Sequence, residues 1–159
     1  VAEGSLKAAN VLAALKKLTA SQNIPLQIKD SSYGSYVSGI AGITNGTRDA
    51  YWNFVVLRSG EWIYPSVGVE QFELQASDKV LVYFGGTDTQ IVNKIETSPL
   101  QPKPGEPFTI KVTQKKWVWN NTTYTSDPVV SPAAGVQVTL AGTTLTTDSQ
   151  GQAVVEKGI

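Results

Sequence analysis

The amino-acid sequence predicts an α+β unit followed by an all-β unit, and three observations support this fold class. Helical periodicity is convincing in one segment, residues 5–20. After Pro25, short apolar runs alternate with glycine- and asparagine-containing turns, which is typical of strands. Four of the eight prolines fall in residues 97–107, which indicates an extended connector. We therefore expect two domains, at residues 1–90 and 91–159.

The predicted helix carries one apolar face. Its apolar residues recur at the i, i+3, i+4, i+7 spacing that buries one side of a helix. They are Ala8, Val11, Leu12, Leu15 and Leu18. Ser5 and Asn10 are both suitable N-caps, and Asn10 would leave a helix of about ten residues. Ser5 would add more than one turn.

Strands and tight turns are expected from residue 33 to residue 84. The run 51–57 is apolar on both faces, which suits a central or well-covered strand. The Asn45-Gly46 and Ser59-Gly60 pairs predict tight turns, the second of which would join 51–57 to a hairpin partner. The predicted strands are 33–42, 51–57, 61–64, 72–74 and 79–84.

The second half reads as β structure throughout. Residues 108–112 and 136–140 alternate apolar and polar side chains, which predicts half-buried strands. We place the boundary between the domains between Gly85 and Pro99. The segment 115–134 reads as a long hairpin or loop inserted in a sandwich. About four strands in all fall short of the roughly seven of a sandwich, so we expect an incomplete domain or a sheet that a neighbouring segment completes.

Composition excludes several kinds of chemistry. The 159 residues have zero formal net charge and contain no His, Cys or Met. There is therefore no imidazole base or ligand, no thiol nucleophile and no disulfide. Zero net charge without a basic stripe argues against a nucleic-acid partner, and no apolar run reaches the roughly 18 residues of a membrane span. We expect a non-enzymatic protein without cofactor or metal, and the absence of oxidisable residues suits an extracellular setting.

Four segments of the first half, in order, form a recognisable series. They are NVLAALKKL (10–18), YGSYVSGIAGI (33–43), YWNFVVLRSGEW (51–62) and FELQASDKVLVYF (72–84). Over residues 5–86 this series resembles a bacterial domain family of unknown function that is related to the C-terminal domain of transcobalamin and intrinsic factor. The resemblance implies a small β-grasp-like unit with one helix. The departures are Asn10 for the usual Thr, Arg58-Ser59-Gly60 for Asn-Gly, and Ser77-Asp78 for Gly-Asp.

Three segments of the second half carry another resemblance. They are the Pro104–Pro107 entry to the first strand, Gly135–Leu140 and Thr146–Ala153. They resemble bacterial immunoglobulin-like and carboxypeptidase-regulatory-like sandwich domains. That resemblance implies an immunoglobulin-like β-sandwich of a kind common on cell surfaces. It also implies that the partners include other domains of a larger surface protein.

An aromatic group in the first half is the richest candidate for a site. Its members are Tyr33, Tyr36, Tyr51, Trp52, Phe54, Trp62 and Tyr64. One interpretation is a hydrophobic core, because aromatic side chains dominate burial. The other is a partly exposed face that stacks on a flat ligand or sugar, with Trp52, Trp62 and Tyr64 as the ligand-binding residues. The transcobalamin resemblance makes a corrinoid the natural flat ligand, although the helical barrel that holds cobalamin in that family is absent from this chain.

Four further residues have alternative interpretations. Trp117 and Trp119 lie two apart and share a face, either as a cover for the sandwich or as an exposed patch. Lys111 could form an isopeptide bond if it were buried beside an amide or carboxyl group, but a solvated lysine is the default. Asp78 falls in a turn, where Asp caps its own backbone.

These features predict a non-enzymatic extracellular module of a bacterial cell-surface protein. The first domain would present or bind a partner, and the sandwich would act as a spacer or adhesion unit. The alternative is a ligand-binding module that uses the aromatic face for a corrinoid or for another flat or sugar ligand.

Overall fold

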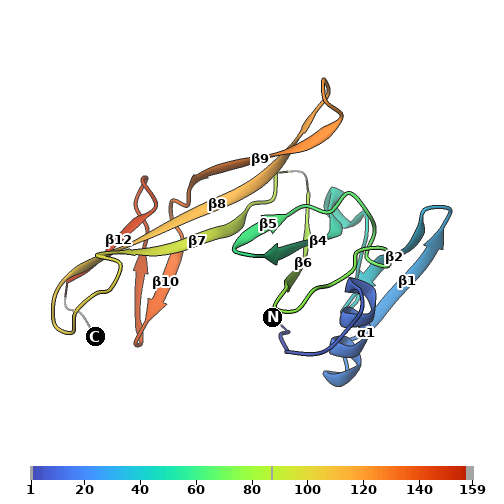
Figure 1. Ribbon diagram of the computed structural model, residues 1–159, viewed down its shortest axis with the longest axis horizontal. Coiled ribbons are helices and arrows are strands. Elements are labelled where there is room, and N and C mark those ends of the chain that lie inside the picture. Colours follow the sequence, from blue (N-terminus) through green and yellow to red (C-terminus); the bar gives the residue numbers. More distant parts are fainter. Residues whose placement is uncertain (1, 87, 157–159) are drawn as a thin grey trace. The chain divides into compact units, whose positions relative to one another are not determined.

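The computed structural model describes residues 2–86 and 88–156 (Figure 1). These residues form several antiparallel sheets and one α-helix, so this part of the chain is mainly β. Its contacts divide the chain into two compact units, Val1–Gly86 (unit 1) and Thr87–Ile159 (unit 2). Each unit is therefore described by itself.

Helix α1 (Val11–Ser21) begins after Asn10, which is one of the two N-caps that the sequence offers. The Asn10 side-chain oxygen accepts a hydrogen bond from the Ala13 backbone N–H at 2.8 Å. The backbone of Asn10 is extended and forms an isolated antiparallel bridge with Glu73, so the helix does not continue back to Ser5. The shorter of the two predicted helices is the one that forms.

Two three-stranded antiparallel sheets accompany α1 in unit 1. One has the order β1-β2-β3 and the other β5-β4-β6. The strands are β1 (Leu26–Ser31), β2 (Gly34–Ile40), β3 (Ile43–Thr44), β4 (Tyr51–Arg58), β5 (Glu61–Ile63) and β6 (Lys79–Gly85). A 3₁₀ turn, Thr47–Asp49, precedes β4. Strand β4 is central in its sheet, which confirms the position predicted for a run that is apolar on both faces.

The segment around Phe72 and Leu74 is not a strand, so the sequence prediction was wrong there. Its one strand-like contact is the bridge of Glu73. Phe72 and Leu74 pack, partly buried, against the core of unit 1, and the Phe72 carbonyl accepts a hydrogen bond from the Val11 N–H. The two apolar side chains alternate with Glu73 because they pack beside the start of α1, and this packing does not require a neighbouring strand.

The apolar core of unit 1 joins α1 to both sheets. Its buried members are Val11, Leu12, Leu15, Val37, Ile40, Val56 and Val69. Phe54 and Phe72 pack against this cluster in an edge-to-face pair, with ring centroids 6.1 Å apart. The predicted apolar face of the helix is confirmed at its three buried positions, whereas Ala8 lies before the helix.

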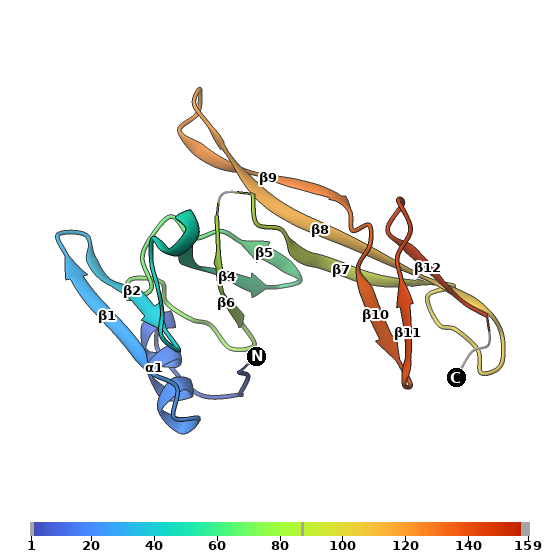
Figure 2. The same ribbon diagram turned by 180° about the vertical axis from the view of Figure 1, so that it is seen from behind.

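Unit 2 is built around one long strand, β8 (Phe108–Asn120), which is prominent in Figure 2. Strand β7 (Ile91–Ser98) pairs with one of its edges, and β9 (Thr125–Pro132) and β12 (Gln152–Val155) pair with successive parts of it. Strands β10 (Gln137–Leu140) and β11 (Thr143–Thr146) form a separate hairpin. The segment 115–134 is thus largely a long hairpin, one of its two predicted forms.

The proline-rich segment 97–107 does not connect the two units, contrary to the sequence prediction. It begins at the end of β7 and reaches the start of β8, and these two strands pair antiparallel. It is therefore a loop inside unit 2. Proline cannot donate a backbone hydrogen bond, and this restriction suits a hairpin loop as well as it suits a connector between domains.

The core of unit 2 lies between β8 and the segments that follow β9. Its buried members are Phe108, Ile110, Val112 and Ala133. Val136, Val138, Leu140 and Val155 pack against them. The predicted alternation in both 108–112 and 136–140 therefore identifies the residues that meet in this core.

Candidate functional site

The three predicted ligand-binding residues do not lie on one face of their sheet. Along a strand, successive side chains point to opposite faces, and paired residues point to the same face. Trp52 pairs with Phe84, which places it with the core-facing residues of β4. Trp62 pairs with Leu57, which lies five positions from Trp52 and so faces the other way.

Trp52 is a partly buried residue of the core side. Its indole N–H donates to the Ile43 carbonyl at 2.8 Å, and its ring lies 5.3 Å from the ring of Phe84, centroid to centroid. Its backbone N–H donates to the Asn45 side chain at 2.8 Å. These contacts occupy the polar and apolar surface of Trp52 within unit 1, so we assign it a packing role.

Trp62 and Tyr64 belong to the opposite face, together with two other tyrosines. Tyr51 and Asn53 of β4 share that face by alternation, and Tyr83 of β6 pairs with Asn53. We call Tyr51, Trp62, Tyr64 and Tyr83 the outer aromatic face. Tyr51 is 54% exposed and Tyr64 is 41% exposed, whereas Trp62 is partly buried.

Two tyrosines of this face, Tyr64 and Tyr83, lie close enough for one to influence the other. Burial raises the pKa of the Tyr83 phenol, and the neighbouring Tyr64 raises it further. The Tyr83 hydroxyl therefore stays protonated at neutral pH and can both donate and accept a hydrogen bond. The outer aromatic face thus offers flat apolar rings together with neutral hydroxyl groups.

The sequence held a signal for this division of the three residues. The two-residue turn Ser59-Gly60 has positive φ at both positions, as a type I′ hairpin turn requires. Such a turn pairs Arg58 with Glu61 and Leu57 with Trp62. Counting back from Leu57 then puts Trp52 on the other face.

The remaining aromatic candidates lie elsewhere. Tyr33, 91% exposed, follows β1 in the β1–β2 hairpin, and Phe54 packs against the core. In unit 2, Trp119 is 56% exposed near the end of the long hairpin and Trp117 is partly buried. Neither tryptophan is among the residues that pack against the core of unit 2, and the exposure of Trp119 favours the patch interpretation.

Lys111 is a solvated lysine, which is the default of its two interpretations. It is exposed on β8, and its cross-strand neighbours are Glu96 of β7 and Gln152 of β12. An isopeptide bond needs a buried lysine, so the structure contradicts that alternative. In the described ranges, no group of three or more acidic side chains is arranged to hold a metal ion.

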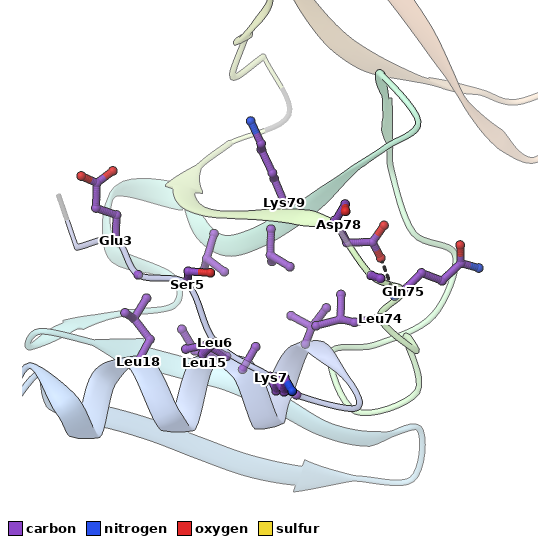
Figure 3. Close-up of a pocket in the computed structure, with 18 residues that line it drawn as sticks. Glu3, Ser5, Leu6, Lys7, Leu15, Leu18, Leu74, Gln75, Asp78 and Lys79 are labelled. Atoms are coloured by element: carbon purple, nitrogen blue, oxygen red, sulfur yellow. Dashed lines mark hydrogen bonds between the residues drawn. The ribbon is translucent and has the colours of Figure 1, made fainter.

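A groove beside α1 is a further feature of unit 1, and the sequence did not indicate it (Figure 3). Its volume is about 840 Å³. Apolar side chains from the helix, from β6 and from the segment before β6 line much of it. They include Val11, Leu15, Leu18, Leu74, Val80 and Val82. Residues 3–8 form another wall, and we call this feature the α1–β6 groove.

Arg58 and Asp78 form an ion pair that the sequence also did not indicate. The Arg58 Nη2 and Nε atoms donate to the two carboxylate oxygens of Asp78 at 2.7 and 3.0 Å. The Asp78 side chain is 3% exposed and also accepts from the Gln75 N–H, so its predicted role in the turn is confirmed. The Arg58 guanidinium lies 5.2 Å from the ring centroid of Phe72. Twenty residues separate the pair, so no local pattern could reveal it.

Replacing Asp78 by Asn should destabilise unit 1 most clearly at neutral pH. The hydrogen bonds from Arg58 hold the pKa of Asp78 below its usual value. A lowered folded-state pKa contributes stability above about pH 4, and this contribution is lost as the pH falls through the folded-state pKa. We expect Asp78→Asn to cost about 2 kcal/mol at pH 7 and to flatten the loss of stability below about pH 4. Urea unfolding between neutral and acidic pH measures both effects.

Asp88→Asn is the matched control, because the Asp88 side chain is 95% exposed and lies 3.9 Å from Lys116. It should leave the unfolding midpoint almost unchanged at every pH. Equal effects of the two substitutions would show that the Arg58–Asp78 pair does not stabilise unit 1.

Comparison of the chain with protein-family models, with curated proteins and with solved structures gives no match. Among the residues that the structure describes, no helix has both the length and the apolar character needed to cross a membrane.

Proposed function

We propose that the chain is a non-catalytic binding module whose outer aromatic face binds sugars. In this proposal unit 1 has the β-grasp-like fold of the transcobalamin-related family. Unit 2 is an immunoglobulin-like sandwich that acts as a spacer in an extracellular protein of the bacterial surface. The proposal includes other domains of that larger protein as partners.

The observation that carries the proposal is the position of Tyr51, Trp62 and Tyr64. They lie on the sheet face that does not contribute to the core cluster of unit 1. A large aromatic ring buries 150–250 Å² when it is covered, so rings left partly exposed together are typical of a binding surface. Val55 lies on the same face and is fully buried, so these rings also cover apolar side chains, although they do not belong to the core cluster that Trp52 and Phe54 pack against.

Sugars suit this face for two reasons. A pyranose ring has an apolar side that can stack on an aromatic ring, and its hydroxyls can pair with neutral tyrosine hydroxyls. The Tyr83 phenol supplies such a neutral hydroxyl. A corrinoid, which the family resemblance implies, is flat as well and serves as the second probe.

Replacing Tyr64 by Ala should weaken sugar binding about three- to tenfold, because one stacked aromatic contact contributes about 0.5–1.5 kcal/mol. Calorimetric titration of the full chain with soluble oligosaccharides of glucose and of N-acetylglucosamine, and with cyanocobalamin, measures this change. Tyr33→Ala is the matched control, since Tyr33 is 91% exposed and lies outside the face.

The two variants distinguish binding at the outer aromatic face from nonspecific binding to exposed tyrosines. The proposal requires the loss to be confined to Tyr64→Ala and to at least one oligosaccharide. If cyanocobalamin binds and no oligosaccharide does, the outer aromatic face binds corrinoids and the sugar proposal is wrong. Equal losses in both tyrosine variants, or no binding of any probe by the unsubstituted chain, would refute an aromatic binding face.

A further inference from the structure

Strand β6 has an open edge. It pairs with β4 along its whole length, and it ends the sheet order β5-β4-β6 on the other side. The outer edge of such a strand presents backbone N–H and C=O groups that can pair with another strand. The five residues from Val80 to Phe84 are all apolar or aromatic, so this edge is long, regular and hydrophobic.

Two edge strands of unit 2 carry features that discourage pairing. Strand β9 contains Pro128 and Pro132, which cannot donate a backbone hydrogen bond. Strand β7 has a bulge between Val92 and Lys94, and it also carries charged side chains. Prolines, bulges and charges are the usual means of blocking an edge. Strand β6 contains no proline, its pairing with β4 is uninterrupted, and its one charged residue is Lys79.

The α1–β6 groove lies beside this edge (Figure 3). Val80 and Val82 of β6 form one wall, and Leu15 and Leu18 of α1 point into it from below. A strand added to β6 would place every second side chain on the same face as Val80 and Val82. Those side chains would enter the groove, so they should be apolar.

The segment before α1 does not pair with the edge of β6. The Gln22 side chain donates to the Glu3 carbonyl at 2.8 Å, and Lys17 donates to the Lys7 carbonyl at 2.5 Å. These bonds hold the segment against the helix. Across residues 2–86, no backbone hydrogen bond joins residues 3–8 to β6.

The exposed charge on β6, outside the groove, favours one acidic residue in the partner strand. Figure 3 shows Lys79 pointing away from the groove floor, on the other face of β6. Lys7 and Glu3 also line the groove, while Asp78 is already paired with Arg58. A residue opposite Lys79 on an added strand would share its face, where opposite charges attract.

We propose that the open edge of β6 accepts an extended segment of a partner polypeptide as a further strand. Its alternate side chains are apolar and fill the α1–β6 groove, and an acidic residue lies beside Lys79. This interaction is separate from ligand binding at the outer aromatic face, because it uses the backbone edge of β6 and the α1–β6 groove.

A short peptide tests this proposal with the full chain. Two versions of the peptide are used, and valine alternates with threonine in both. A glutamate stands at the N-terminal end of one and at the C-terminal end of the other, so that parallel and antiparallel pairing with β6 are both tested. We expect anisotropy of the labelled peptide to show binding, and hydrogen exchange to show slower exchange at the outward amides of β6. Methylating alternate backbone nitrogens of the peptide should weaken binding at least tenfold, because it removes the donors that pair with the edge.

Substitutions test the charge. Lys79→Glu should weaken binding of the glutamate peptide about fivefold, and Lys29→Glu, the same change at an exposed lysine of β1, should not alter it. The proposal is overturned by equal binding of the methylated and unmethylated peptides, or by no binding at the highest soluble concentration. Self-association of the chain that protects β6 without peptide would also overturn it, since the occupant would then be a second copy.

Discussion

Gly151→Ala should destabilise unit 2 by about 3 kcal/mol or more, the largest loss we expect from adding one methyl group. Gly151 has φ +71°, a left-handed conformation that costs an L-residue about 1–2 kcal/mol. An added Cβ would also overlap the Val112 carbonyl oxygen and lie 2.9 Å from the Ala133 nitrogen. These backbone atoms cannot move aside easily, because the Val112 carbonyl accepts from Ala133 and the Val112 N–H donates to Gly151.

Gly142→Ala separates the conformational cost of a positive φ from the cost of steric overlap. Gly142 has φ +81°, but nothing lies within 4 Å of its added Cβ. It should therefore lose only the conformational part, about 1–2 kcal/mol. Urea unfolding, followed by circular dichroism, compares the two variants. Equal losses would contradict the close approach of β12 and β8 at Gly151.

Leu12→Ala should cost about 3–4 kcal/mol in unit 1, because it removes a large side chain from the centre of the core. Leu12 is 5% exposed on the buried face of α1. Its backbone N–H donates to the Val69 carbonyl at 2.8 Å, which fixes the helix start against the core and limits relaxation around a cavity.

Leu100→Ala makes the same chemical change at a side chain that is 82% exposed. It should change the stability by less than about 0.5 kcal/mol. Thermal unfolding measures the stability of both variants. The unfolding midpoint of Leu12→Ala should fall by about 10 °C or more, because 1 kcal/mol corresponds to roughly 4–8 °C for a unit of this size. A small loss for Leu12→Ala would show that α1 does not pack on the core as described.

Local patterns in the sequence predicted the elements that depend on local chemistry. The apolar spacing located α1, and the pair of possible caps already contained the correct one, Asn10. The choice between Asn10 and Ser5 depended on the bridge from Asn10 to Glu73, which lies far away in the sequence. A local pattern cannot contain such a contact.

The wrong predictions have a common physical cause. The Phe72–Leu74 alternation and the prolines of 97–107 describe side-chain packing and backbone restriction, and neither property specifies a neighbouring strand. The pairing of β7 with β8 determines that the prolines form a loop within unit 2. The contact between Arg58 and Asp78 likewise depends on how two turns meet in the folded unit.

Ligand binding by Trp52, Trp62 and Tyr64 stays a prediction. Aromatic enrichment pointed to the sheet that carries the outer aromatic face, and two of the three predicted residues, Trp62 and Tyr64, lie on that face. Trp52 does not, because the face of each residue follows from the hairpin register. The α1–β6 groove depends on the spacing between a helix and a sheet edge, which no single segment encodes.

The indole N–H resonances of the four tryptophans give the most direct test of the proposed binding face. In a titration of the full chain with the tightest-binding oligosaccharide, the Trp62 resonance should shift. The Trp52 resonance should stay in place, because its N–H is bonded to the Ile43 carbonyl on the core side. A shift confined to Trp117 and Trp119 of unit 2, or a shift of Trp52 without Trp62, would contradict sugar binding at the outer aromatic face.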